Sequence, residues 1–200
     1  VTAANTGTTT VRVGSLTAKT LKPAENDDKR THVFELLAQR ITGFVEPHFI
    51  SDDMVRGNED EADALAIYED NYDMIERVGF ITNDRHGFVL GFSPDALVGS
   101  DGVVEVKSRR QKYQIATILA NQCPSDFMIQ IQTGLLVSER KWCDFISFSA
   151  GLPMVTVRVE EDPAMQKAII EAAKKFNDDV DALFEQYAQR MANQIGRAHV

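Results

Sequence analysis

The chain has 200 residues, 44% of them hydrophobic and 26% charged, and its formal net charge at pH 7 is -9. This composition excludes disorder and fibrous repeats, while the length is sufficient for one continuous hydrophobic core. The acidic balance excludes a protein that coats nucleic acid with a uniformly basic surface. Because the sequence has no linker and no internal repeat, we expect a single domain over residues 1–200.

No apolar run approaches the roughly 20 residues of a membrane span, and residues 1–10 lack the layout of a signal peptide. The sequence therefore predicts a cytoplasmic protein with no membrane partner. Its two cysteines, Cys123 and Cys143, are too few for an iron–sulfur cluster. We expect neither such a cluster nor a nucleotide cofactor, and the four histidines have no spacing typical of metal ligands.

The charge is distributed unevenly along the chain. Residues 46–85 contain twelve acidic and three basic residues, so this segment alone accounts for the whole deficit of nine. Residues 1–30 and 105–112 are net basic. An acidic protein with local basic segments remains compatible with binding to phosphate groups.

Helical spacing of apolar residues predicts helices over 31–42 and about 53–75. The second helix is expected to bury Ala62, Leu65, Ala66 and Tyr68, and its acidic residues Glu59 and Asp60 are expected to be solvated. The pattern then changes to that of strands over 88–92, 96–98 and 103–106. A turn at Asp101-Gly102 joins the last two strands into a hairpin.

Helices are predicted over 111–122 and 125–138, and strands over 144–149 and 154–159. A long helix should run from Pro163 to about Gln194, with a solvated acidic face and a weak point near Asn177. This order of elements predicts an α/β (α+β) fold in which a central mixed β-sheet is flanked by helices.

Chemistry is most strongly indicated by Asp95, Glu105 and Lys107. Glu105 and Lys107 share one face of a strand, and the hairpin turn can bring Asp95 beside Glu105. Two carboxylates can hold Mg²⁺, and the ammonium group can stabilise charge that develops on a phosphate. The alternative is an exposed ion pair on a surface hairpin, worth less than about 1 kcal/mol.

Four ordered blocks give the chain a resemblance to a known family. They are Arg12-Val13-Gly14-Ser15-Leu16-Thr17-Ala18, Gly57-Asn58-Glu59-Asp60-Glu61, Asp95 with Glu105-Val106-Lys107, and Gln130-Ile131-Gln132 followed by Cys143-Asp144-Phe145. Together they resemble the phage lambda exonuclease/YqaJ-type viral recombinase family of the PD-(D/E)xK nuclease superfamily, which has a restriction-endonuclease-like core.

The resemblance implies a role for each matching position. Asp95, Glu105 and the backbone carbonyl of Val106 would hold Mg²⁺, for which Mn²⁺ would substitute, and Glu61 would reach the same metal site from its helix. Lys107 would be the catalytic lysine. Gln132 would lie close to the attacking water or the scissile phosphate, with Gln130 as the weaker candidate.

Basic residues would contact the DNA. By resemblance, Arg12 and Thr17 would lie in a pocket for the terminal 5′-phosphate. This chain departs from the family pattern with Lys19 after the first motif and with Ser108-Arg109 after Lys107. It remains open which of Arg109, Arg110 and Lys112 faces the DNA. The chain also begins close to its first motif, which raises the expectation that an upstream family segment is missing.

The function implied is that of a Mg²⁺-dependent 5′-to-3′ exonuclease on double-stranded DNA, which leaves 3′ single strands for phage-type recombination. The family precedent also implies a homotrimeric ring and a single-strand annealing protein as partner. Two alternatives remain open: a structure-selective or restriction-type endonuclease, and a non-catalytic DNA-binding protein with the same fold.

Overall fold

In the computed structural model, the described residues are 11–12, 22–23, 26–47 and 52–197. The elements follow in chain order as β1 (Val11–Arg12), β2 (Lys22–Pro23), α2 (Asp27–Thr42), α3 (Asp52–Asn71), β3 (Ile81–Asn83), β4 (Leu90–Phe92), β5 (Ala96–Val98), β6 (Gly102–Ser108), α4 (Gln111–Ala120), α5 (Ser125–Ser138), β7 (Trp142–Phe148), β8 (Val155–Glu160) and α6 (Pro163–Arg197). Within these residues no helix is both long and apolar enough to cross a bilayer.

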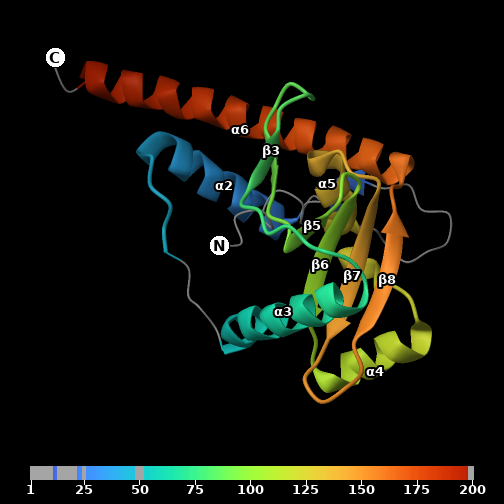
Figure 1. Cartoon of the computed structure of the whole chain (residues 1–200). Coiled ribbons are helices and arrows are strands. Elements are labelled where there is room, and N and C mark those ends of the chain that lie inside the picture. Colours follow the sequence, from blue (N-terminus) through green and yellow to red (C-terminus); the bar gives the residue numbers. More distant parts are fainter. Residues whose placement is uncertain (1–10, 13–21, 24–25, 48–51, 198–200) are drawn as a thin grey trace.

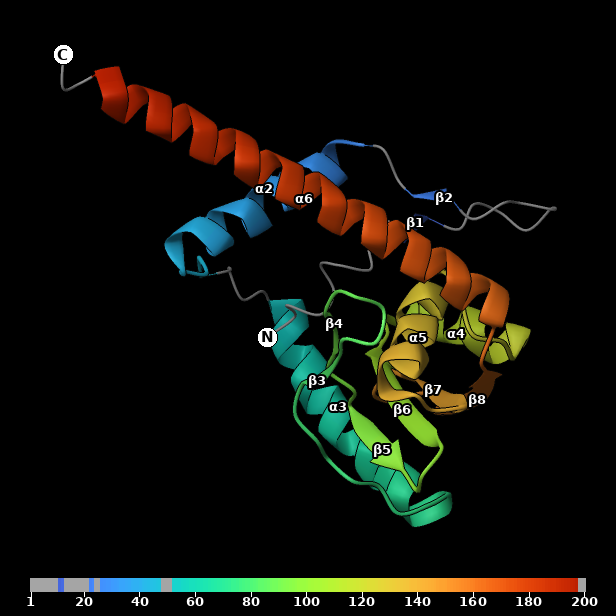
Figure 2. The same ribbon diagram turned by 90° about the horizontal axis from the view of Figure 1, so that it is seen from above.

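The central sheet has four strands in the order β5-β6-β7-β8. Strands β5 and β6 are antiparallel, β6 and β7 are parallel, and β7 and β8 are antiparallel, so the predicted mixed sheet is confirmed. Helix α3 covers one face of the sheet, and α5 covers the other face with α4 beside it (Figures 1 and 2). The first five residues of β6 are buried because both faces of the strand are covered.

Alternate residues of β6 belong to two different parts of the core. Val104 and Val106 pack with Leu65 and Tyr68 of α3. Val103 packs on the opposite face, among side chains of α5 such as Ile131. Glu105 and Lys107 have the same parity as Val103, so their side chains leave the strand on the α5 face.

Local signals explain most element boundaries. Asn26 caps α2, because its side-chain oxygen accepts the backbone N–H of Lys29 at 2.9 Å, and the helix therefore begins four residues before the predicted start. Gly43 ends α2 as predicted, in the left-handed conformation at φ 67°.

Several predicted details of the first half are wrong. Helix α3 ends at Asn71 rather than near residue 75. It buries Ala64, Leu65 and Tyr68, whereas Ala62 and Ala66 are exposed. Only residues 90–92 of the predicted 88–92 strand are extended, and they pair with the unpredicted strand β3.

Helix α6 is continuous across Asn177, so the expected weak point is absent. The Asn177 side chain donates to Asp181 one turn later and also accepts from Arg40 of α2. Asparagine is a poor helix former, but through these contacts Asn177 lies on the face of α6 that packs against α2.

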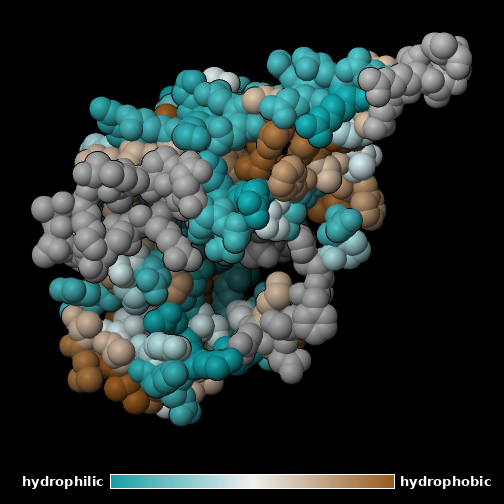
Figure 3. All heavy atoms as spheres, turned by 180° about the vertical axis from the view of Figure 1, so that it is seen from behind, coloured by the Kyte–Doolittle hydropathy of each residue, from teal (hydrophilic) through white to brown (hydrophobic). Residues whose placement is uncertain are grey.

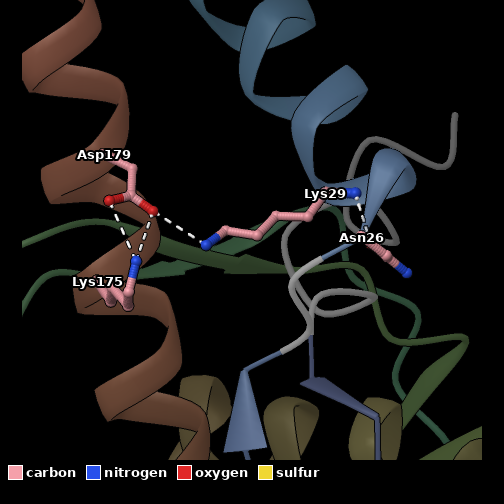
Figure 4. Close-up of polar contacts among 4 residues, drawn as sticks. All are labelled: Asn26, Lys29, Lys175 and Asp179. Atoms are coloured by element: carbon pink, nitrogen blue, oxygen red, sulfur yellow. Dashed lines mark hydrogen bonds and ion pairs between the residues drawn. The ribbon is translucent and has the colours of Figure 1, made fainter.

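The acidic face of α6 is only partly solvated. Asp179 accepts hydrogen bonds from Lys175 of its own helix and from the buried Lys29 of α2, both at 3.0 Å (Figure 4). Asp181 pairs with Arg40. These charge pairs fasten α2 to α6, while 37% of the Asp179 side chain and 55% of the Asp181 side chain remain exposed, so the predicted solvated face is retained and two of its acids pair with α2.

Apolar side chains gather in separate patches on the face opposite to that of Figure 1, and hydrophilic side chains cover much of the remainder (Figure 3). One exposed apolar group belongs to α4, where Ile115 and Leu119 point to solvent. This short helix begins directly after Arg109 and Arg110, which follow strand β6.

Candidate active site

Asp95 and Glu105 meet where the β5–β6 hairpin begins. The pairing of Ala96 with Val104 fixes the register, and Asp95 directly precedes β5. Its Oδ2 accepts the backbone N–H of Val106 at 2.6 Å. The turn therefore brings Asp95 to the two residues that follow Val104, as the sequence predicts.

Glu105 is a carboxylate in the protein interior, with 2% of its surface exposed. Its Oε1 accepts a hydrogen bond from the Nζ of Lys107 at 2.7 Å and another from the amide of Gln130. Its Oε2 is buried and has no partner among the described residues. Since an unsatisfied buried oxygen is costly, this atom is suited to bind a ligand that supplies positive charge.

Burial, together with the negative charge of Glu105, raises the pKa of Asp95 to about 8, although the Val106 N–H opposes the shift. Burial also raises the pKa of Glu105, against the effect of Lys107. Two carboxyl groups that resist simultaneous ionisation are stabilised as anions by a bound cation.

Glu61 of α3 approaches from the face opposite to α5. Its charge raises the pKa of both Asp95 and Glu105, which places it within electrostatic range of both. No group of three His, Cys, Asp or Glu side chains within the described ranges is close enough to hold a metal ion together. The described groups that could hold a divalent cation here are the two carboxylates of the hairpin and nearby backbone oxygen, and an ion such as Mg²⁺ readily completes its shell with water.

Asp60 does not lie on a solvated surface, in contrast to the expectation for it, and only 7% of its surface is exposed. It accepts a hydrogen bond from the hydroxyl of Ser108, and Arg56 lies beside it at 3.9 Å. This contact fastens α3 to the last residue of β6. The helical pattern did not indicate that Asp60 is buried, because its burial depends on a hydrogen-bond partner 48 positions away in the sequence.

The two glutamines of α5 have different surroundings. Gln130 donates to Glu105, whereas Gln132 is fully buried and faces away from the hairpin. The amide of Gln132 donates to the carbonyl of Glu160 at 2.8 Å and accepts the N–H of Asp162 at 2.7 Å. The expected order is therefore reversed: Gln130 reaches the carboxylates, and Gln132 ties α5 to the junction of β8 and α6.

The basic residues predicted to face DNA are only partly described. Arg109 is half-buried directly after β6, whereas Arg110 and Lys112 are exposed at the start of α4. The backbone of Arg12 lies in β1, but its side chain is outside the described part of the structure. Thr17 and Lys19 are outside the described residues altogether.

The sequence did not indicate the two aromatic rings, Phe127 and Phe145, that lie beneath Lys107. Phe127 of α5 lies below the Nζ of Lys107, which is 5.6 Å from its ring centroid. The ring stacks on the buried Phe145 of β7, with 5.3 Å between centroids. Its spacing of four residues from Ile131 indicates a core position in the helix but gives no information on the lysine.

Comparison with known proteins gives one matching domain family and several similar structures. The sequence model of the YqaJ-like viral recombinase domain matches residues 9–141. None of the curated proteins matches the sequence.

Two similar structures are of one exonuclease. The crystal structure of an alkaline exonuclease from Laribacter hongkongensis is 30% identical, covers 86% of this chain and 89% of its own, and has a TM-score of 0.76. Its complex with dAMP is 31% identical, covers 86% of this chain and 88% of its own, and has a TM-score of 0.75.

A phage-related exonuclease from Haemophilus somnus 129PT has a TM-score of 0.55 at 16% identity, over 93% of this chain and 94% of its own. At this identity the likeness concerns the fold alone. The mixed sheet with helices on both faces is thus shared with structures of exonucleases.

Proposed function

Because the chain belongs to the YqaJ-like viral recombinase domain family, we propose that it is a Mg²⁺-dependent 5′-to-3′ exonuclease on double-stranded DNA. The 3′ single strands that it leaves would serve recombination by strand annealing. The observation that carries this proposal is the buried Glu105 Oε2, which has no partner within the described residues, next to the buried Asp95, whose pKa is raised to about 8. Both features favour occupation of the site by a divalent cation.

Asp95, Glu105 and the backbone carbonyl of Val106 are the proposed metal ligands, and Glu61 adds negative charge from α3. When bound, the ion supplies Lewis-acid polarisation of the phosphate and lowers the pKa of its water. Lys107 is held by Glu105 and directs its ammonium group at the charge that develops on the phosphate. Gln130 orients Glu105 through its hydrogen bond, so we assign to it the position first expected for Gln132.

DNA contacts are assigned by charge and by family position. Arg12, Thr17 and Lys19 are proposed to bind the terminal 5′-phosphate, and Arg109, Arg110 and Lys112 are candidates for other phosphates. The proposed assembly is a homotrimeric ring that works with a single-strand annealing protein in the cytoplasm of a bacterial host. Mn²⁺ is expected to replace Mg²⁺, since both prefer oxygen ligands.

The proposal is tested by digestion of linear duplex with and without a 5′-phosphate, in Mg²⁺ and in EDTA. We expect nucleotide release that requires the metal and is faster from the phosphorylated end. A covalently closed plasmid should stay intact, and its cleavage would instead favour a restriction-type endonuclease. Binding to DNA without release in any metal would favour a non-catalytic protein, and an absent 5′-phosphate preference would remove the role of Arg12.

Substitution of Gln132 should mainly lower stability, whereas substitution of Gln130 should mainly lower the rate of turnover. Gln132→Ala leaves the Asp162 N–H and the Glu160 carbonyl without their buried partner, so we expect a loss of about 1–3 kcal/mol in the free energy of unfolding. Gln130→Ala should lower kcat about tenfold with a smaller effect on unfolding. Denaturant unfolding and single-turnover digestion check both effects, and a catalytic defect confined to Gln132→Ala would reverse the assignment.

Metal binding should depend on pH through Asp95. The pKa of Asp95 is about 8 in the folded protein and near 3.8 in the unfolded chain, so the folded state binds the extra proton between these values. The stability of the metal-free protein should therefore fall as pH rises towards 8. Mg²⁺ displaces the proton, so its apparent affinity should increase over the same range, by at most about tenfold per pH unit.

Titration calorimetry in two buffers with different ionisation enthalpies measures the released proton directly. Asp95→Asn should abolish the stability gradient assigned to this carboxyl group and weaken Mg²⁺ binding. Equal proton release at pH 6 and pH 9 would contradict the raised pKa.

A further inference from the structure

The guanidinium group of Arg109 lies over two aromatic rings. Its Cζ lies 5.0 Å from the ring centroid of Phe127 and 5.2 Å from that of Tyr113. The Phe127 ring is itself fixed by stacking on Phe145, which is fully buried. Cation–π contacts on two rings restrict the orientation of a planar guanidinium more than a single contact does.

This guanidinium has no oxygen partner among the described residues. Its Nε is buried without a hydrogen bond. In contrast, Arg158 is bidentate on Asp144, and Arg140 donates to three backbone carbonyls. An oriented arginine fork without an acceptor is suited to bind an anion that is supplied from outside the chain.

Arg109 also continues the row of side chains that forms the candidate active site. Its backbone N–H donates to the carbonyl of Phe148 at 2.6 Å, which extends the β6–β7 pairing one residue beyond the strand. Glu105, Lys107 and Arg109 therefore leave the backbone on the same face at intervals of two residues. Phe127 lies under both cations, at 5.6 Å from the Lys107 Nζ and 5.0 Å from the Arg109 Cζ.

We propose that Arg109 binds the DNA phosphate next to the reacting one, and that Phe127 and Tyr113 are the positioning residues that aim it. Phe127 has a second effect, because its ring also lies under Lys107. The same ring therefore positions both the cation that binds the phosphate and the catalytic lysine. The proposal rests on the proposed function and selects Arg109 from the three basic residues that follow β6. Arg110 and Lys112 lie exposed at the start of α4, and the Nζ of Lys112 lies 4.8 Å from the ring centroid of Tyr113.

Two pairs of variants separate the two rings. Phe127→Leu removes the support of both cations, so it should lower kcat and weaken DNA binding, each by about three- to tenfold. Tyr113→Leu removes one ring from Arg109 alone and should raise KM by a similar factor while kcat stays within about twofold. Phe127→Tyr and Tyr113→Phe keep the rings and should restore both constants.

Arg109→Gln tests the phosphate contact itself. Binding of a fluorescent duplex in EDTA, followed by anisotropy over a range of salt concentrations, should weaken about tenfold, and the slope of log K against log salt should fall by about one. Arg109→Lys keeps the charge and should retain the slope, but it should bind less tightly because it lacks the fork. An unchanged slope in Arg109→Gln would overturn the assignment.

Matched controls exclude a general effect of altered packing. Phe176→Leu removes a buried ring from the α2–α6 contact, and Tyr187→Leu removes a partly exposed ring from α6. Both should keep kcat and KM near those of the unaltered protein at a temperature where each is folded. If Phe127→Leu behaves like Phe176→Leu in both constants, the positioning role is wrong.

Different results would contradict the proposed exonuclease function and the proposed role of Arg109. A chain that binds duplex but releases no nucleotides in any metal contradicts the proposed function, while the salt slope of Arg109→Gln still tests the phosphate contact. An active enzyme in which the ring variants and Arg109→Gln change nothing contradicts only the present inference.

Discussion

Lys107→Ala is expected to lower kcat for the digestion of linear duplex by about 100- to 1000-fold. The ammonium group is held at 2.7 Å from Glu105 and over the ring of Phe127, so its position is fixed before substrate binds. Loss of one such preorganised electrostatic group typically removes about 2.7–4 kcal/mol of transition-state stabilisation. Single-turnover digestion in Mg²⁺ measures this effect directly.

Lys107→Met is the stricter variant, because it keeps an apolar stem over Phe127 and removes only the charge. Lys174→Ala is the control, since this lysine forms only an exposed pair with Asp178. Both Lys107 variants should retain the fold, as judged by circular dichroism and thermal unfolding. Activity equal to that of the unaltered enzyme in folded Lys107→Met would exclude the lysine from the chemistry.

Asp144→Ala should give the largest loss of stability among the substitutions considered. The Asp144 carboxylate is buried, accepts the hydroxyl of Tyr68 at 2.6 Å, and pairs with both Nε and Nη2 of Arg158. The same contact and burial raise the pKa of Tyr68 far above its ordinary value. Removal of the carboxylate leaves a buried hydroxyl and a guanidinium without their acceptor, at a cost of about 3 kcal/mol.

For a domain of this size, that loss corresponds to a decrease of roughly 6–12 °C in Tm. Asp144→Asn keeps an acceptor for Tyr68 and should lose less, while the exposed Asp178→Ala serves as the control. Thermal and denaturant unfolding measure the series. A change below about 0.5 kcal/mol in Asp144→Ala would show that Tyr68 and Arg158 find other partners.

The elements that the sequence predicted well are those whose pattern depends on near neighbours. Helix α5 has the predicted bounds, and the predicted hairpin that carries Asp95 and Glu105 forms, although its turn lies at residues 99–101 rather than at Asp101-Gly102, because Gly102 already pairs with Val98. The row of Glu105 and Lys107 follows from the two-residue period of a strand alone. The motifs that resemble the family supplied the proposed roles of the site residues. The match of the family model to residues 9–141 confirms the resemblance.

The errors share a different origin, because each depends on contacts between distant residues. Asp60 is buried through Ser108, and α6 remains intact at Asn177 through Arg40 of α2. Gln130 and Gln132 belong to the same motif, yet one meets Glu105 and the other meets Glu160. Two residues along a helix turn a side chain by roughly 200°, so only the packing of α5 decides which glutamine faces the hairpin.

The fold also shows where the excess negative charge of the chain is located. The acidic segment 46–85 includes α3, which brings Glu61 to the carboxylates of β5 and β6. Two acids of α6 pair with bases of α2 while remaining partly exposed to solvent. Net charge alone could not distinguish a repulsive surface from a concentrated cation site.

The sequence by itself determined the mixed α/β fold, the family, and the residue types of the candidate site, because periodicity and motif spacing are properties of neighbouring positions. Only the tertiary structure decided that two buried atoms of the candidate site, the Oε2 of Glu105 and the Nε of Arg109, have no partner among the residues that the structure describes. Whether a polar atom is satisfied depends on groups from β6, α4 and α5 that meet only when the sheet and its helices pack together. These two atoms support the proposals that the site binds a cation and a phosphate.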